Sequence, residues 1–184
     1  MPLSLVLPQP AVDDAAFKAA MDHLASGVAL VAWGGAEPKG FLVNTLTVLS
    51  TQPARVLFGV EKSRPQHDAL LTADRCAISL LGEGDEAEAQ RFSRHDPQRS
   101  RFASGRWRVT RDGPPLLTDS LVRLEGFIDQ RIDAGSHSLF IVRVSEAVVR
   151  HETPLVFFDQ AFRKLAPPER QATASDRAFL EAQA

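Results

Sequence analysis

The sequence predicts a mostly β protein, built as an antiparallel barrel or sandwich with a few peripheral helices. Short runs rich in Val, Leu, Ile and Phe recur along the chain and are separated by Gly, Pro and Asp, which is the pattern of strands joined by turns. Residues 121–132 alternate apolar and polar side chains, as a strand with one buried face does. Strands do not alternate regularly with long helices, so a doubly wound parallel sheet is not expected.

Length and composition limit the class of protein. The 184 residues fit a single domain, which we expect to span 1–184 with its core at about 14–166 and a C-terminal tail at 167–184. The 21 basic and 23 acidic side chains nearly cancel, so no nucleic-acid partner is expected. The single cysteine, Cys76, excludes an intrachain disulfide. No signal-peptide pattern and no run near the roughly 20 apolar residues of a membrane span occur, which predicts a cytoplasmic protein without a membrane partner.

The first elements expected along the chain are a helix and three strands. Asp13 or Asp14 is a suitable N-cap for the helix. An apolar stripe then follows at helical spacing: Phe17, Met21 and Leu24. Gly27 is expected to end this helix in the left-handed conformation. Turns rich in Gly and Pro separate the strands that follow, which are expected at 28–33, 40–50 and 55–60.

The remaining elements are two helices, a long loop and five strands. A polar loop at 61–66 precedes them, and residues 95–113, rich in Arg, Ser and Gly, are interpreted as a long loop with a helical turn. The alternation of apolar residues predicts one long hairpin that turns at Gly135. Ser175 is expected to cap a final short helix, or the tail frays. The expected helices lie at 67–72 and 85–94, and the expected strands at 75–81, 121–132, 138–149, 155–158 and 162–165.

The stretch 40–50, Gly-Phe-Leu-Val-Asn-Thr-Leu-Thr-Val-Leu-Ser, carries unusually many amides and hydroxyls for a core strand. Asn44 and Thr45 are adjacent, so a regular strand would point them to opposite faces. Asn is also disfavoured in the middle of a strand. We predict that 40–50 is a central strand of the barrel whose polar side chains contact a ligand. An edge strand with a solvated face is the alternative, and the stretch alone does not decide between them.

The sequence contains no convincing dinucleotide-binding, metal-binding or nucleophile motif. Gly82-x-Gly84-x-x-Ala87 matches a loose dinucleotide-binding fingerprint, but Asp85, Glu86 and Glu88 would place negative charge where a pyrophosphate must lie. We interpret it as a helix cap. The five histidines form no ligand pair at helical spacing, so no metal site is predicted. Without a nucleophile elbow or a P-loop, any demanding chemistry is expected to belong to an organic cofactor.

Several short segments share their order and spacing with one known family. They lie at 17–21 with 24–28, at 40–50, at 62–64, at 89–92 with 101–102, at 115–117, at 135–137 and at 162–165. Residues 40–50 are similar to the family's G-M-T-V-N-S-F-T-S-V-S, and 135–137 to its G-D-H. Together these segments resemble the flavin reductase family with the FMN-binding split-barrel fold. No single motif is specific, but their order and spacing together are fairly so.

The resemblance implies an antiparallel split β-barrel of the Greek-key, FMN-binding type. It implies an oxidoreductase that transfers hydride from NADH or NADPH to FMN or FAD and supplies the reduced flavin to a partner monooxygenase. The flavin lies near a dimer interface in this family, so a homodimer is implied as well. The alternative is a non-catalytic flavin-binding or partner-docking protein on the same fold.

The resemblance also assigns roles to individual residues. A flavin needs donors and acceptors at its pyrimidine edge, and its phosphate needs hydroxyls and a cation. The implied cofactor-binding residues are Asn44, Thr45, Leu46, Thr47, Ser50, Lys62, Ser63, Arg64 and Arg163. His137 is implied to lie near the nicotinamide and is the candidate catalytic residue. Without the family, the charges of 62–64 would be interpreted as solvated, and His137 as a strand-end residue.

Four positions depart from the family pattern. Leu42 stands where the family often has Thr, and Val48 where it often has Ser. Gln66 replaces a Thr beside the phosphate loop, and Ser136 replaces the Asp of G-D-H. Each change removes a polar group within reach of a ligand in the family pattern. Leu42, Val48 and Ser136 therefore favour the binding-protein alternative more than a typical member would.

Overall fold

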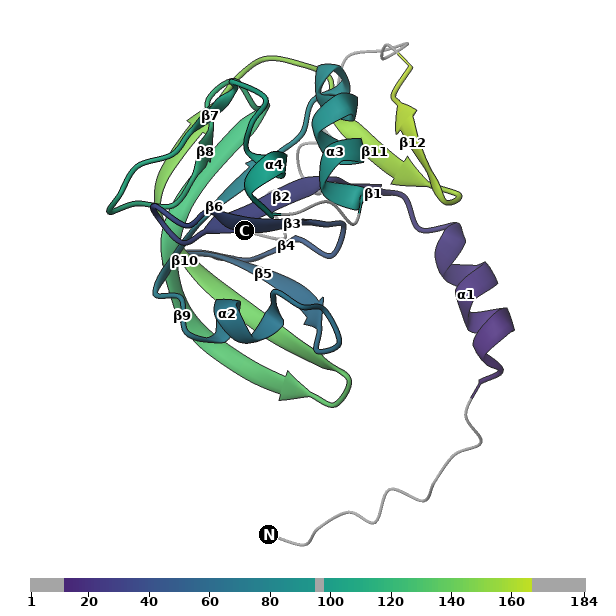
Figure 1. Ribbon diagram of the computed structural model, residues 1–184. Coiled ribbons are helices and arrows are strands. Elements are labelled where there is room, and N and C mark those ends of the chain that lie inside the picture. Colours follow the sequence, from purple (N-terminus) through teal and green to yellow (C-terminus); the bar gives the residue numbers. More distant parts are fainter. Residues whose placement is uncertain (1–11, 95–97, 167–184) are drawn as a thin grey trace, which may run out of the picture.

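The computed structural model describes residues 12–94 and 98–166, and a curved antiparallel sheet is its centre (Figure 1). Within the described residues, seven strands form this sheet in the order β3-β2-β6-β9-β10-β5-β4. In that order the strands are Lys39–Val43, Ala29–Trp33, Arg75–Leu80, Val122–Ala134, His137–Val149, Ala54–Glu61 and Thr47–Thr51. The mostly β class with antiparallel strands is confirmed.

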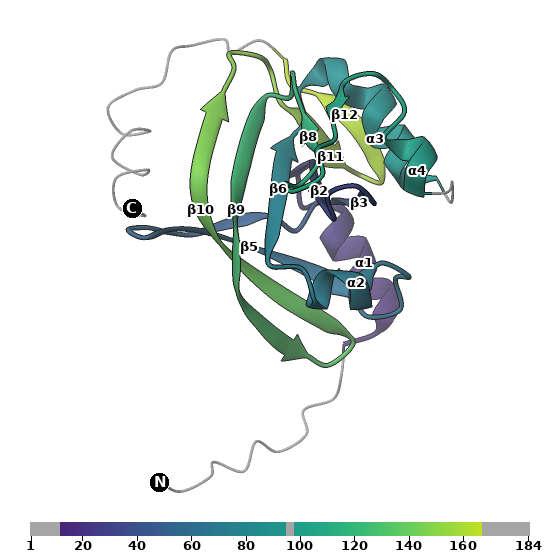
Figure 2. The same ribbon diagram turned by 60° about the vertical axis from the view of Figure 1, so that its left-hand side comes forward.

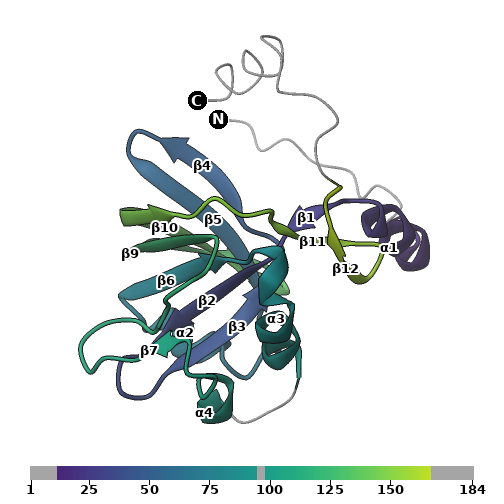
Figure 3. The same cartoon turned by 90° about the horizontal axis from the view of Figure 1, so that it is seen from above.

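Smaller elements surround the barrel. A minor sheet joins β1 (Ser26–Gly27), β11 (Leu155–Phe158) and β12 (Ala161–Lys164), and β7 (Trp107–Arg108) pairs with β8 (Leu116–Leu117). The helices are α1 (Asp14–Asp22), α2 (His67–Leu71), α3 (Glu86–Ser93) and α4 (Gln98–Arg101), with a short 3₁₀ turn at Glu83–Asp85. Figure 3 shows α3 standing with the minor sheet at one end of the barrel. No helix of the described ranges is long and apolar enough to cross a membrane.

Strand β2 is buried on both faces and separates two apolar cores. One face contributes Val31 and Trp33 to the inner core of the barrel, which also holds Phe58 and Phe140. The other face contributes Leu30 to an outer core. The outer core also holds Phe92, Phe102, Leu117 and Leu155, which bring α3 and the minor sheet against the barrel. Each of these large side chains contributes about 1.5–3 kcal/mol by leaving water, so the outer core fixes α3 in place.

The barrel is split between β3 and β4. These strands lie at opposite edges of the sheet, yet only residues 44–46 connect them. Four consecutive Cα steps reach at most about 15 Å, so the two edges must face each other closely. The hydroxyl of Thr45 accepts from the Gly59 N–H at 3.1 Å and donates to the Gly59 carbonyl at 3.2 Å. The Thr45 side chain therefore holds the connecting residues 44–46 against β5, at a point where no backbone pairing of the described residues does so.

The prediction that 40–50 forms one central strand is wrong. The segment breaks at Asn44 into β3 and β4, and both are edge strands. β4 is largely exposed, as the alternative of a solvated edge strand predicted. The break arises because the side chain of Thr45, rather than its backbone, satisfies Gly59, which lets the chain leave one edge and join the other.

The predicted N-terminal helix forms but ends earlier than expected. Asp13 caps α1 by accepting from the Ala16 N–H at 3.0 Å. Gly27 is not a left-handed helix cap, contrary to prediction, because its backbone pairs with Val156 in the minor sheet. Figure 1 shows α1 projecting away from the barrel. None of its residues is buried.

The long hairpin is confirmed, with β9 and β10 paired antiparallel around the turn at Gly135. Figure 2 shows these strands curving along one wall of the barrel, while the β4–β5 hairpin extends from the body. The interpretation of Gly82 as part of a helix cap is also confirmed, since its N–H donates to the Asp85 carboxylate at 2.8 Å. The expected final helix at Ser175 and the tail 167–184 lie outside the described residues.

Candidate active site

Three adjoining cavities form one groove along the open edge of β3. Their volumes are about 300, 150 and 300 Å³, and Arg64 lines all three. Two of the three cavities are lined by residues 42–44, at the end of β3 and just after it, which places the groove at the split of the barrel. We refer to these three cavities together as the groove. Its walls come from the end of α3, the loop 61–66, the minor sheet and the start of β10.

The wall formed by α3 depends on the absence of a side chain at Gly40. A Cβ at that position would lie 3.1 Å from the Phe102 ring and 3.2 Å from the Phe92 ring. It would also approach the Val31 carbonyl to 2.9 Å. Glycine thus lets the two rings pack directly on β3 in an edge-to-face pair. As a result Phe92 and the neighbouring Ser93 reach the groove.

Arg64 is held over the groove without a counter-ion. The loop that carries it is fixed by backbone hydrogen bonds from Lys62 N to the Ser136 carbonyl at 2.9 Å and from His67 N to the Arg64 carbonyl at 2.9 Å. Its guanidinium lies 5.8 Å from the centre of the Phe41 ring, a cation–π contact. Within the described residues, no carboxylate pairs with it. An exposed, oriented and unpaired guanidinium is well suited to bind a phosphate.

One end of the groove is basic. Arg64, Arg94 and Arg101 line the same cavity, and none of its lining residues within 12–94 and 98–166 is acidic. Arg101 is buried, and its guanidinium donates to the Arg94 carbonyl at 2.7 Å. The cavity therefore combines fixed positive charge with the apolar rings of Phe41 and Phe92. This chemistry favours an anionic ligand with a planar apolar body.

His137 and Asn44 lie at the other part of the groove. His137 begins β10 and lines the same cavity as Asn44, Thr45 and Arg64. The Ser136 hydroxyl shares a hydrogen bond of 2.9 Å with the Nδ1 of His137. The residue that replaces the family's Asp therefore still orients the imidazole. The Asn44 amide is exposed and makes no hydrogen bond within residues 12–94 and 98–166, so it is available to a ligand.

Five of the predicted cofactor-binding residues take other positions. Lys62 forms an ion pair of 2.7 Å with Asp133, whose pKa is lowered by that hydrogen bond. Leu46 packs against the inner core, and the Ser50 hydroxyl donates to the Pro53 carbonyl at 2.6 Å. The remaining two, Thr47 on β4 and Arg163 on β12, are exposed. None of the five lines the groove.

Ser63 is exposed beside Arg64 and does not line the groove either. The structure brings together Asn44, Thr45, Arg64 and His137 from the predicted set. Lining residues that the prediction left out come from α3 and the minor sheet: Phe92, Ser93, Phe157 and Phe162. The segments 89–92 and 162–165 carried a signal, because both belonged to the family resemblance. No group of three or more His, Cys, Asp or Glu side chains in the described part of the chain is arranged to hold a metal ion.

The family follows from a direct comparison of the sequence. The model of the family "Flavin reductase like domain" matches residues 21–166. The chain belongs to the flavin reductase-like domain family. The matched residues include every strand of the barrel and every residue that lines the groove. The recognition made from scattered motifs is therefore confirmed.

Curated relatives and solved structures agree with this assignment. The chain is 32% identical over 165 residues to an FMN reductase (NADH) RutF 1 of Methylorubrum extorquens, covering 89% of this chain and 82% of that protein. It matches the Streptomyces globisporus NADH:FAD oxidoreductase SgcE6, solved with NAD and FAD fragments, at a TM-score of 0.80 and 28% identity, covering 89% and 99%. It also matches BorF, the flavin reductase component of a bacterial two-component tryptophan halogenase, at 0.77 and 28%, covering 85% and 100%. The split-barrel fold is thereby confirmed.

Proposed function

We propose that this protein is an NADH-dependent flavin reductase that reduces FMN or FAD and passes the reduced flavin to a partner oxygenase. The observation that carries the proposal is the groove, in which an unpaired guanidinium, a free amide and an oriented imidazole meet at the split of the barrel. Relatives with the same fold are named as NADH-dependent reductases of FMN and of FAD. The donor set of the groove fits a flavin, because it joins aromatic walls to a basic end.

Each groove residue then has a physical task. When bound, the flavin supplies the hydride acceptor, and NADH supplies the hydride. Arg64 binds the phosphate, and Asn44 hydrogen-bonds the polar edge of the ring system. Phe157 and Phe162 exclude water from the ring face beside the minor sheet. His137, oriented by Ser136, positions the nicotinamide amide so that donor and acceptor meet in a reactive geometry.

The test is NADH consumption by the purified chain with added FMN, FAD or riboflavin. We expect consumption that depends on both flavin and protein, and it should be fastest with a phosphate-bearing flavin. Colour on the purified protein without NADH consumption would instead support the carrier alternative. Neither colour nor consumption would reject both flavin functions. The same assay with NADPH decides between the two nicotinamides, for which NADH is proposed because the relatives are named for it.

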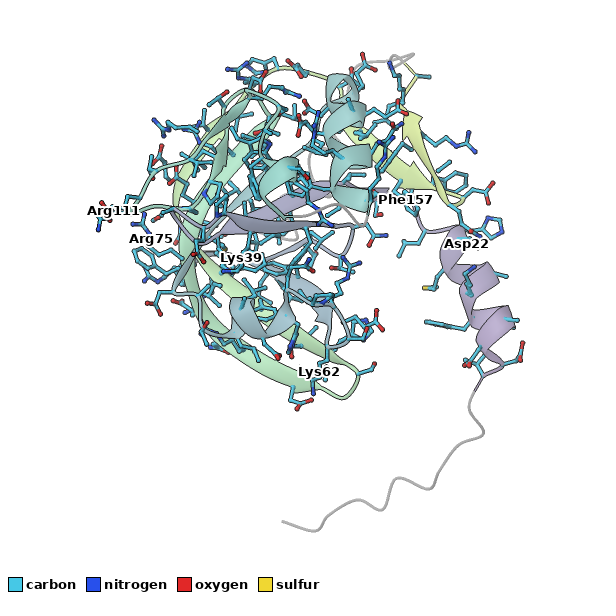
Figure 4. The ribbon with its side chains drawn as sticks, viewed as in Figure 1. Asp22, Lys39, Lys62, Arg75, Arg111 and Phe157 are labelled. Atoms are coloured by element: carbon cyan, nitrogen blue, oxygen red, sulfur yellow. The ribbon has the colours of Figure 1, made fainter. Side chains whose placement is uncertain are left out.

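We also propose that the working form is a homodimer. α1 exposes an apolar stripe, with Phe17 at 54% and Met21 at 45% of their full accessibility. At its C-terminal end, Asp22 accepts hydrogen bonds from the Asp159 N–H and the Gln160 side-chain amide (Figure 4). A second copy would cover the stripe. Analytical ultracentrifugation should show a dimer that Phe17→Asp dissociates, and a monomeric unmodified chain would refute this. The identity of the oxygenase and the cytoplasmic location stay predictions.

A further inference from the structure

A further cavity, separate from the three that form the groove, lies on the side of the barrel away from the groove. Its volume is about 450 Å³, and it shares no lining residue with the three cavities of the groove. The β2–β3 turn, the end of α2, the start of β6 and the loop before β8 line it. Figure 4 shows Lys39, Arg75 and Arg111 toward this side, while Phe157 of the groove lies on the other. We refer to it as the basic cavity.

The backbone builds the basic cavity through one close approach. Gly35 has a φ of +51°, and a Cβ at that position would collide with the backbone carbonyl of Arg111. Only glycine combines this conformation with this approach at low cost. The β2–β3 turn and the loop before β8 are therefore packed together. That packing places Arg111 at the same cavity as Lys39 of β3 and Arg75 of β6.

The three cations of the basic cavity lack anionic partners. Among the described residues, Lys39, Arg75 and Arg111 form no ion pair and no side-chain hydrogen bond. The Arg75 guanidinium only stacks on the Phe127 ring, 5.2 Å from its centre. Asp74 and Asp112 also line the cavity but pair with none of the cations. This contrasts with Arg106, which is paired with two carboxylates.

Trp33 supplies an aromatic wall to the basic cavity. Its side chain is buried, with 2% of its surface exposed, and its indole Nε1–H has no hydrogen-bond partner in the described part of the chain. Ala69, Ala73 and Pro114 add further apolar surface. A volume of about 450 Å³ lies in the range of about 300–1,000 Å³ typical of small-molecule sites, which combine apolar walls with a few polar groups.

We propose that the basic cavity binds a small organic anion, a molecule with a phosphate or carboxylate group on an aromatic or apolar body. Lys39, Arg75 and Arg111 bind the anionic group, and the apolar wall of Ala69, Ala73 and Pro114, with Trp33 buried in it, contacts the body. Both anionic groups present oxygens that guanidinium groups bind in pairs. The site is separate from the proposed flavin and nicotinamide site, so this proposal can be tested independently of the reductase activity.

Trp33 is also the reporter for the test, because the chain has only two tryptophans. In a Trp107→Phe chain, the emission of Trp33 is titrated with phenyl phosphate and with benzoate, at an ionic strength held constant with NaCl. Phenol serves as the neutral probe. We expect a saturable change with at least one of the two anions and none with phenol. The anion that saturates identifies the preferred group.

Variants assign the response to the cavity. Lys39→Ala and Arg111→Ala should each weaken the apparent affinity about tenfold, the loss of about 1.4 kcal/mol of one charge-assisted contact. Lys164→Ala, which removes an exposed cation from β12, and Arg64→Ala, which removes the groove cation, should leave it unchanged. Calorimetry on the unmodified chain provides the second measurement if Trp107→Phe folds poorly. No saturable binding by either method, or a response lost in Arg64→Ala rather than Arg111→Ala, would overturn the proposal.

Discussion

Replacing Arg64 by Ala should weaken FMN binding selectively. Arg64 lines all three cavities of the groove, its guanidinium is oriented by Phe41, and it has no counter-ion within the described residues. A hydrogen bond to a charged group contributes about 1.5–3 kcal/mol. Because Arg64 is exposed and water screens its charge, we take the lower end of that range. About 1.4 kcal/mol corresponds to a tenfold change in Kd, so the Kd for FMN should rise about tenfold.

Riboflavin, which lacks the phosphate, provides the internal comparison. Its Kd should change less than about twofold, roughly 0.4 kcal/mol, because Arg64 is proposed to contact only the phosphate. Lys62→Ala is the matched control, since Lys62 is two residues away and is already paired with Asp133 at 2.7 Å. It should alter neither Kd. Quenching of flavin fluorescence measures all six constants. Equal losses for both flavins, or a larger effect of Lys62→Ala, would show that Arg64 does not bind the phosphate.

Three further predictions concern catalysis and stability. His137→Ala should raise the NADH KM or lower kcat about 10- to 100-fold while the flavin Kd stays constant; unchanged kinetics would make it a strand-end residue. Arg106→Leu should cost about 3 kcal/mol in urea unfolding, because it leaves the buried Asp85 carboxylate unpaired, and a loss below about 1 kcal/mol would contradict this. Hydrogen bonding to Arg106 lowers the pKa of Asp119 in the folded protein. The Asp119 carboxylate therefore stabilises the fold at pH values above the pKa of Asp119 in the unfolded chain, and this stabilisation is lost as the pH falls through the lower pKa of the folded protein. Unfolding of Asp119→Asn should therefore depend less on pH in the acid range, and an unaltered profile would refute that assignment.

The sequence predicted those parts of the fold that depend on local patterns. The alternation of 121–132 and the turn at Gly135 determined the long hairpin, and β9 and β10 pair as expected. The break in 40–50 was not predictable, because it depends on Thr45 bonding Gly59, 14 residues along the chain. Local propensity contains no information about such a partner, so the segment was expected to be one continuous strand.

The candidate site was predictable in part for the same reason. Nothing in the sequence distinguishes Lys62 from Arg64 as a phosphate ligand. In the structure Lys62 pairs with Asp133, which is 71 residues away in the chain, and this is why Arg64 rather than Lys62 is proposed to bind the phosphate. Likewise, Phe157 and Phe162 enter the groove only because the minor sheet packs beside α3. Residues that reach the groove only through tertiary packing cannot be identified without the structure.

The measurement that tests the central claim most directly is NADH oxidation by Asn44→Trp at saturating FMN. Asn44 is exposed and lines two of the three cavities, so an indole there fills the groove without disturbing either core. Thr47→Trp, on the exposed strand β4 outside the groove, is the matched control. With melting temperatures confirming that both variants fold, the account predicts that Asn44→Trp loses more than about tenfold in kcat/KM, at least 1.4 kcal/mol of transition-state binding, while Thr47→Trp retains full activity. Full activity of Asn44→Trp would show that flavin is reduced elsewhere on the protein.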